Sequence, residues 1–223
     1  MKRMNWKKVR VVRKIKSVKQ LTKNPYLNMY QLDIRNDEDK KFDYYVASRA
    51  KCIEDAKFQT KKDNADGVFV FCLYRDDVAQ EEKMVLVRQY RCSIDGWIYE
   101  YPAGLVDEGE DYKTAGKREL KEETGLDFMP LDVDDMYTKP RYTSIGMTDE
   151  ACGIVYGYAT GEISKEGQEE TEEIDIILAN REEVRRILKE ERIAVGCAYM
   201  MMHFLNTEEG HVFDFLKSEY CNN

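Results

Sequence analysis

The stretch 104–126 constrains this chain more than any other, because it combines signals that begin and end a helix with a dense set of carboxylates. Asp111 is a residue type that caps a helix N-terminus, since its side chain accepts bonds from backbone N–H groups. Gly125 readily adopts the left-handed conformation that commonly ends a helix. Together they predict one short helix between residues 111 and 125, and this helix carries Glu119, Glu122 and Glu123.

Three carboxylates of that helix, Glu119, Glu122 and Glu123, stand at positions i, i+3 and i+4 and share one face within an arc of roughly 100°. Like charges at this spacing destabilise a helix. A hard divalent cation removes the repulsion, because oxygen ligands are what Mg²⁺, Mn²⁺ and Ca²⁺ prefer. The alternative interpretation is a solvated acidic face on which Arg118 and Lys121 act as local counter-charges.

The spacing of the surrounding residues favours the metal-binding interpretation. Gly104 is followed after five residues by Glu110, and after seven more by R-E-L-K-E-E-T-G-L at residues 118–126. This pattern resembles a complete Nudix box, the signature of a family of metal-dependent pyrophosphate hydrolases. The resemblance implies an α/β/α sandwich around a mixed sheet, and the order of expected strands and helices favours the same α/β fold class.

The resemblance implies a metal site with four ligands: Glu119, Glu122, Glu123 and the backbone carbonyl of Ala103. It also implies Mg²⁺ as the cofactor, with Mn²⁺ as a substitute and two or three ions per site, and Glu122 is counted among the catalytic residues too. Such ions would neutralise a diphosphate and lower the pKa of a bound water that attacks phosphorus. The other fixed residues of the box are expected to be structural: Gly104, Glu110, Arg118 and Gly125.

Beyond the box, the chain resembles the ADP-ribose (ADP-sugar) pyrophosphatase branch of the family. The likeness lies in V-L-V-R-Q-Y-R at residues 85–91, in W-I-Y-E-Y-P-A-G-L-V-D-E-G-E at 97–110 and in S-I-G-M-T-D-E at 144–150, although Ile145 stands where the branch commonly has proline. The branch implies hydrolysis of ADP-ribose to AMP and ribose 5-phosphate. The alternatives are another nucleotide sugar, such as GDP-mannose or UDP-glucose, and a non-catalytic Nudix sensor that binds ADP-ribose.

The general base of the branch lies in an acidic loop, which corresponds to Q-E-E-T-E-E at residues 168–173. A carboxylate there would accept the proton of the attacking water. The role carries over first to Glu170 and second to Glu172. The alternative is that one or both are solvated loop acids.

Three residues are candidates for substrate binding. Arg91 matches a substrate-binding arginine of the branch, and a guanidinium suits bidentate contact with phosphate oxygens. Its alternative is an ordinary arginine at a strand end. Arg49 and Glu150 are the other two candidates. The adenine ring needs an aromatic partner for stacking, for which the available side chains are Trp6, Tyr26 and Tyr30.

The chain has 223 residues, enough for a large domain with a smaller appendage. Residues 1–62 are predicted to form a small β-rich domain, and residues 63–223 are predicted to form the Nudix domain. The branch implies a homodimer that forms through the N-terminal domain.

The segment from Lys2 to Lys23 holds ten Lys or Arg residues and no acid. It is either a solvated basic surface or a means of attracting an anionic diphosphate.

Hydrophobic periodicity, β-branched residues and turn signals place the main elements. A helix is expected to start at Asn180, since Glu183 follows it three positions later, and a second helix is expected over residues 194–205. The expected strands are 9–18, 29–34, 42–49, 68–74, 84–91, 97–101, 151–160 and 174–178.

Composition limits the partners and the location. A net charge of −8 argues against a general nucleic-acid binder. No apolar run approaches the roughly 18 to 20 residues needed to cross a bilayer, and no apolar signal core follows the basic N-terminus. The six cysteines form no C-x-x-C pair, which argues against a zinc site or a disulfide framework. From composition we therefore expect a cytoplasmic protein with no nucleic-acid or membrane partner, while the resemblance implies a nucleotide-sugar substrate.

Overall fold

The computed structural model describes residues 14–36, 39–75, 81–169 and 173–217. The chain divides into two compact units. The first unit contains residues up to 64 together with the segment 142–151, and the second contains residues 65–141 and those from Cys152 onward. The first unit therefore draws on two stretches that lie far apart in the sequence.

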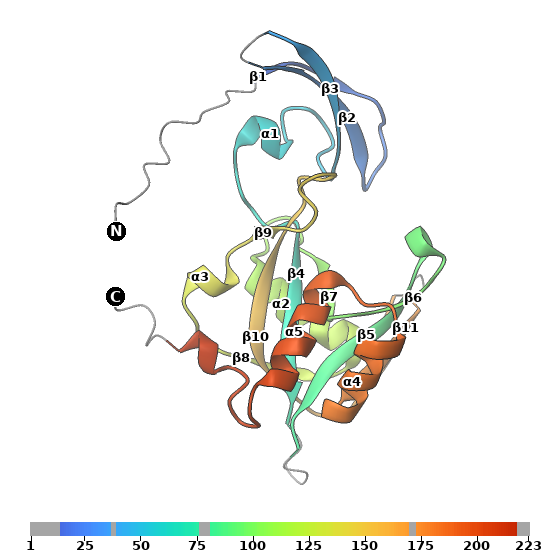
Figure 1. Cartoon of the computed structure of the whole chain (residues 1–223), viewed down its shortest axis with the longest axis vertical. Coiled ribbons are helices and arrows are strands. Elements are labelled where there is room, and N and C mark those ends of the chain that lie inside the picture. The colour runs from blue at the N-terminus through green and yellow to red at the C-terminus, as the bar shows by residue number, and fades with distance from the viewer. Residues whose placement is uncertain (1–13, 37–38, 76–80, 170–172, 218–223) are drawn as a thin grey trace. The chain divides into compact units, whose positions relative to one another are not determined.

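The first unit is built on a three-stranded antiparallel sheet of order β1-β2-β3. Alternate residues of β2, among them Tyr30, Leu32 and Ile34, are buried in a small core that includes Val46 of β3. This alternation arises because successive side chains of a strand point to opposite faces. The elements are β1 (Lys14–Gln20), β2 (Asn28–Arg35), β3 (Lys41–Ser48) and the helix α1 (Lys57–Thr60), shown in Figure 1.

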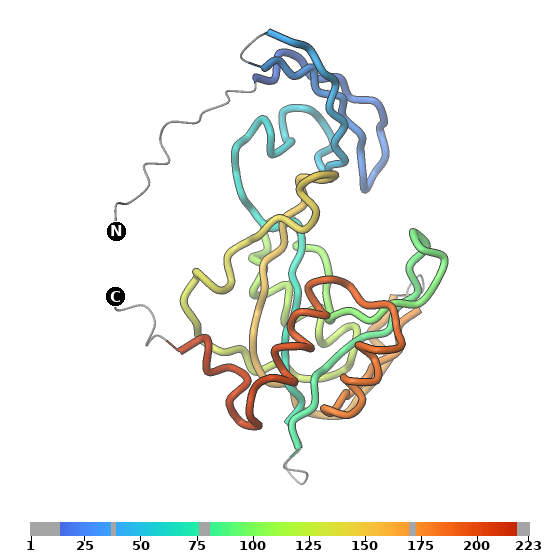
Figure 2. The backbone as a smooth tube through the Cα atoms, viewed as in Figure 1, coloured from blue at the N-terminus to red at the C-terminus, as the bar shows by residue number. Residues whose placement is uncertain are grey.

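The second unit contains an eight-stranded mixed sheet of order β11-β5-β4-β10-β8, with β6 on β5, β7 on β4 and β9 on β10. Strands β4 and β10 run parallel and lie side by side, as the tube in Figure 2 shows, whereas β5 is antiparallel to β4, β6 and β11. The strands are β4 (Gly67–Tyr74), β5 (Lys83–Arg91), β6 (Gly96–Glu100), β7 (Ala103–Leu105), β8 (Asp127–Pro130), β9 (Arg141–Tyr142), β10 (Ala151–Thr160) and β11 (Ile174–Ala179).

Helices cover both faces of this sheet (Figure 1). Val70 and Cys72 of β4 pack in one core cluster with Leu120 of α2, and the intervening Phe71 packs in a second cluster with Phe204 of α5. The predicted α/β/α sandwich around a mixed sheet is thus confirmed. The helices are α2 (Tyr112–Thr124), α3 (Asp135–Thr138), α4 (Arg181–Glu190) and α5 (Val195–Asn206), with short 3₁₀ turns η2 (Cys92–Ile94) and η3 (Asp214–Leu216).

The longer strands and helices follow the sequence-based predictions to within a residue or two. The short elements β7, β8, β9, α1 and α3 were not predicted, because they hold two to four residues each and carry little periodic signal. The first residues of the strand expected over 9–18 lie outside the described part of the chain. No helix within that part is both long enough and apolar enough to span a bilayer.

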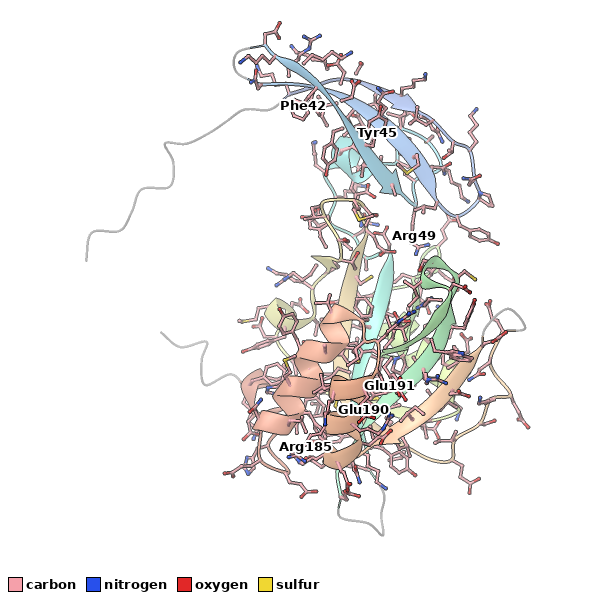
Figure 3. All side chains as sticks on the ribbon, turned by 45° about the vertical axis from the view of Figure 1, so that its right-hand side comes forward. Phe42, Tyr45, Arg49, Arg185, Glu190 and Glu191 are labelled. Carbon is pink, nitrogen blue, oxygen red and sulfur yellow. The ribbon has the colours of Figure 1, made fainter. Side chains whose placement is uncertain are left out.

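Helix α4 begins as expected. Asn180 caps it by accepting a bond from the Glu183 N–H at 3.0 Å. The Glu183 side chain, however, accepts bonds from Arg186 and not from the backbone N–H of Asn180. Arg186 also bonds Glu191, which is labelled in Figure 3 at the end of this helix, and the Tyr99 hydroxyl. These bonds connect α4 to the sheet.

Helix α2 also begins and ends where the sequence predicts. The Asp111 carboxylate accepts bonds from the N–H groups of Lys113 at 2.9 Å and Thr114 at 3.2 Å. Gly125 adopts a φ of 75°, and its N–H donates to the Lys121 carbonyl at 2.9 Å. Both ends therefore satisfy backbone groups that a helix terminus leaves without partners.

We expect Asp111→Ala to lower the free energy of unfolding by about 1 kcal/mol, because two N–H groups lose their acceptor. Urea unfolding followed by circular dichroism measures this loss. Asp111→Asn keeps an acceptor oxygen and serves as the matched control, since Asn caps as well as Asp. An unchanged midpoint in Asp111→Ala would contradict a capping role.

Candidate metal-binding and active site

Helix α2 and strand β7 bring the residues of the box together. The Glu123 side chain is buried, with the residue 3% exposed, and its Oε2 accepts a bond from the Ala103 N–H at 3.1 Å. A Cβ on Gly104 would lie 1.9 to 2.2 Å from the carboxyl atoms of Glu119. Only glycine leaves room for that carboxylate at this position. Two of the proposed ligands therefore contact the peptide segment that supplies the proposed carbonyl ligand.

Arg118 lies at the centre of the acidic side chains. Its Nη1 bonds both Glu119 Oε1 and Glu122 Oε2, each at 2.9 Å. On its other side, Nε and Nη2 bond the two oxygens of Glu110 at 3.3 and 2.9 Å, and Nη2 also donates to the Leu105 carbonyl. The guanidinium thus holds three carboxylates of one helix and its preceding turn in fixed relative positions.

The ion pair shifts the pKa values of both partners. Hydrogen bonding from Arg118 lowers the pKa of Glu110 below its ordinary value of 4.5, and the same contact raises the pKa of the Arg118 guanidinium. Glu110 is shielded from solvent, with its side chain 15% exposed. The charged form of the carboxyl is therefore the form that stabilises this part of the fold.

A pH dependence of stability follows from the lowered pKa. The contribution of Glu110 is complete above about pH 4.5 and is lost as the pH falls through the lower pKa of the folded state. We expect wild type to lose stability more steeply than Glu110→Gln as the pH drops below about 4.5. Urea unfolding at pH 7, 5, 4 and 3 for both proteins measures the difference. Parallel profiles would contradict this role of Glu110.

The site suits a hard divalent cation, judged by its donors. Glu119 and Glu122 bond the same nitrogen atom, so their oxygens already face one point, and Glu123 and the Ala103–Gly104 peptide lie beside them. Every candidate donor is an oxygen, the ligand type that Mg²⁺ and Mn²⁺ prefer. In the described residues no three His, Cys, Asp or Glu side chains already converge as a complete ligand set. Arg118 occupies the place between two of the carboxylates.

The two candidate general bases, Glu170 and Glu172, lie outside the described residues. Glu169, which precedes them, is exposed. Gln168 is half-buried, and its side chain donates to the Glu123 carbonyl at 2.7 Å. Sequence reasoning did not single out Gln168, and no local signal could have done so, because its partner lies 45 positions away.

Arg91 ends β5 and its Nε donates to Glu100 Oε2 on β6 at 2.7 Å. The Arg91 side chain is 44% exposed, so its remaining N–H groups are accessible. Sequence reasoning missed Glu100. The neighbouring Arg88 lies over the ring of Trp97 at 4.7 Å and pairs with Asp175 at 3.7 Å. The end of β5 therefore presents cationic groups that are each held by a neighbour.

Arg49 and Glu150 belong to the first unit, where they bond each other through Arg49 Nη2 and Glu150 Oε1 at 2.8 Å. Figure 3 labels Arg49 just beyond β3, with Tyr45 and Phe42 earlier on that strand. Both members of the pair line a cavity of about 430 Å³ within this unit, whose other walls include Met29.

The aromatic residues considered for adenine stacking differ in their surroundings. Tyr30 is fully buried, and its hydroxyl bonds the Ala50 carbonyl at 2.7 Å, so the interpretation of Tyr30 as an available stacking residue is wrong. Tyr26 is 75% exposed. Trp6 lies outside the described residues. A buried ring already packed in a core cannot also stack on a ligand.

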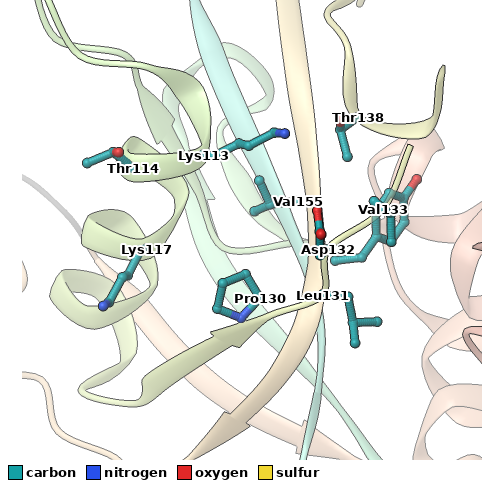
Figure 4. A pocket seen from close by; sticks show the side chains of 10 residues that line it. Lys113, Thr114, Lys117, Pro130, Leu131, Asp132, Val133, Thr138 and Val155 are labelled. Atoms are coloured by element: carbon teal, nitrogen blue, oxygen red, sulfur yellow. The ribbon is translucent and has the colours of Figure 1, made fainter. Parts of the chain in front are cut away.

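A second cavity, of about 520 Å³, lies in the second unit along another flank of α2 (Figure 4). Its polar lining includes Lys113, Lys117 and Asp132, and its apolar lining includes Val155 and Leu131. At about 100° per residue, Lys113 and Lys117 are separated around the helix from Glu119 and Glu122. This cavity is therefore distinct from the carboxylate cluster.

Comparisons with known proteins identify the family. The model of the NUDIX domain matches residues 63–196. The chain is 32% identical over 136 residues to the methanol dehydrogenase activator of Bacillus methanolicus, covering 59% of this chain and 70% of that protein. It is 27% identical over 136 residues to the ADP-ribose pyrophosphatase of Bacillus subtilis, with the same coverage of 59% and 70%. The chain belongs to the Nudix family.

A solved structure shows the same fold. An ADP compounds hydrolase superposes with a TM-score of 0.56 at 17% identity, covering 80% of this chain and 83% of that chain. At this identity the likeness concerns the fold alone. With the family match and the relatives, the predictions of a Nudix hydrolase and of a resemblance to the ADP-ribose pyrophosphatase branch are confirmed. The predicted cytoplasmic location stays a prediction.

Proposed function

We propose that this Nudix hydrolase uses Mg²⁺ to split the diphosphate bond of a nucleoside diphosphate sugar, and that its substrate is ADP-ribose. The observation that carries the proposal is the grouping of Glu119, Glu122 and Glu123 beside the Ala103–Gly104 peptide. Support for the substrate comes from the Bacillus subtilis relative, which is named an ADP-ribose pyrophosphatase.

The metal ligands in this proposal are the three glutamates and the Ala103 carbonyl. When bound, divalent ions there would supply charge neutralisation of the diphosphate and a bound water of lowered pKa. Arg118 would keep the carboxylates in place through its bonds to Glu119 and Glu122. Glu110 would in turn orient Arg118 through two bonds to the guanidinium.

The remaining roles follow the chemistry of each side chain. Glu170, or else Glu172, would accept the proton of the attacking water. Arg91 would bind phosphate oxygens with the N–H groups that Glu100 does not use. Arg49 and Glu150 would contact the substrate from the cavity that they line. Positioning and charge neutralisation account for most of the catalysis in such phosphoryl transfers.

We also propose that the protein forms a homodimer through its N-terminal unit. The support is the exposure of aromatic side chains on β3, where Phe42 and Tyr45 are 37% and 52% exposed. Sedimentation equilibrium measures the mass directly. A monomer of 26.2 kDa at micromolar concentration would contradict the dimer.

The substrate is tested with a panel of ADP-ribose, GDP-mannose and UDP-glucose, with and without Mg²⁺, in which AMP, GMP and UMP are quantified. We expect AMP to dominate, and EDTA to abolish product formation. Dominant GMP or UMP would replace ADP-ribose with another nucleotide sugar. Tight ADP-ribose binding without Mg²⁺-dependent turnover would instead favour a non-catalytic sensor.

A further inference from the structure

The C-terminal turn of α2 is completed by residues from a later part of the chain. A helix end leaves its last carbonyls without intrahelical partners. The Glu123 carbonyl accepts from the side chain of Gln168 at 2.7 Å, and the Thr124 carbonyl accepts from the Ser164 N–H at 3.0 Å. Residues 164–168, called the capping segment here, therefore satisfy two carbonyls in the turn that carries Glu122 and Glu123.

The capping segment approaches the helix so closely that two glycines are required. A Cβ on Gly167 would lie 2.7 Å from the Glu122 carbonyl oxygen and 2.9 Å from its Cα. A Cβ on Gly125, whose φ is 75°, would lie 2.6 Å from the Ser164 nitrogen. Because backbone atoms stand at both contacts, no rotation of a side chain could relieve the clash.

The capping segment is also ordered internally and anchored to the sheet. The Gln168 N–H donates to the Lys165 carbonyl at 3.2 Å, and the Glu166 N–H donates to the Ser164 hydroxyl at 3.2 Å. Lys165 pairs with Asp175 of β11 at 2.8 Å. The donor on Gln168 is thus presented to the helix by a segment that is itself fixed.

Glu123 connects this segment to the proposed metal site. Its carbonyl accepts from Gln168, while its buried carboxylate accepts from the Ala103 N–H. We infer that Gln168 is a positioning residue that fixes the last turn of α2, and so holds the carboxylates of Glu122 and Glu123 in place beside the Ala103 carbonyl. This inference rests on the proposed function, because it takes those groups as the metal ligands.

The test compares Mn²⁺ binding to the full chain, by isothermal titration calorimetry, for wild type, Gln168→Ala and Gln168→Lys. We expect Gln168→Ala to raise the Kd for Mn²⁺ about tenfold, the size of effect seen when a partner behind a metal ligand is removed. Gln168→Lys keeps an N–H donor of similar reach and should restore the wild-type Kd. Turnover of Gln168→Ala should recover at saturating Mn²⁺, since the defect lies in binding.

A matched control and a second variant separate positioning from folding. Glu166→Ala alters an exposed side chain of the same segment and should leave the Kd unchanged. Gly167→Ala should raise the Kd as Gln168→Ala does, whereas Gly196→Ala, where a Cβ meets no atom within 4 Å, should not. Urea unfolding of each variant shows that the titrated protein is folded.

Different results would contradict the positioning role of Gln168 and the proposed metal-dependent function. A wild-type Kd in folded Gln168→Ala overturns the positioning role, while loss of Mn²⁺ binding in Glu122→Gln would leave the proposed function standing. A raised Kd that Gln168→Lys does not restore also overturns it. If Glu122→Gln binds Mn²⁺ as wild type does, the ligand set is wrong and both proposals fall.

Discussion

Glu122→Gln and Glu123→Gln are each expected to lower kcat by several orders of magnitude, on the order of 10³-fold or more, while the fold is retained. A bound metal stabilises both the developing charge and the nucleophile, so losing a ligand removes both contributions. Glutamine at position 123 still offers an oxygen to the Ala103 N–H, so this bond of the buried side chain is kept. The measurement is kcat with Mg²⁺ on the nucleotide sugar that the panel selects, combined with Mn²⁺ titration calorimetry.

The matched control is Glu108→Gln, which makes the same chemical change at an exposed position in the turn before α2. It should keep wild-type turnover and Mn²⁺ binding. Near-normal kcat in either Glu122→Gln or Glu123→Gln would show that the proposed ligand set is wrong. A lost fold, seen by circular dichroism, would make the buried Glu123 a structural residue instead.

Glu170→Gln is expected to lower kcat by about 10²- to 10⁴-fold and to leave the Kd for Mn²⁺ unchanged, because a lost general base affects proton transfer and not the metal ligands. Single-turnover kinetics with Mg²⁺ measure the chemical step, and the pH–rate profile should lose its acidic limb in the variant. This separation of kcat from metal affinity is the signature that distinguishes a base from a ligand.

The control for this prediction is Glu169→Gln, the adjacent exposed acid of the same loop, which should retain wild-type kcat. If Glu172→Gln alone shows the loss, the order of the two candidates is reversed. If neither variant loses more than a few-fold, the acids of this loop are solvated side chains and the base lies elsewhere.

Local signals in the sequence were sufficient for the helix that carries the site. Asp111 and Gly125 set the ends of α2 because each acts on backbone groups within four residues of itself. That Glu119, Glu122 and Glu123 share one face of the helix then followed from helical geometry alone. The nearly unbroken apolar run of β4, V-F-V-F-C-L-Y at residues 68–74, likewise predicted a strand buried on both faces, and its side chains divide between two cores.

The first unit shows what local signals could not predict. The segment 142–151 pairs with β3, through the Ala47 N–H and the Met147 carbonyl at 2.9 Å. It also supplies Glu150, the partner of Arg49. Nothing within either stretch indicates the other, because the pairing depends on contacts between residues about a hundred positions apart.

The sequence by itself determined the family, the fold class and the helix that presents the carboxylates, since these depend on short-range spacing. Only the tertiary structure decided that the Glu119 carboxylate lies against Gly104, that Glu123 bonds Ala103, and that Gln168 completes the end of α2. Each of these contacts joins segments separated in the chain, so its formation depends on how the sheet and helices pack. The spacing of residues within a single helix or strand does not specify such long-range contacts.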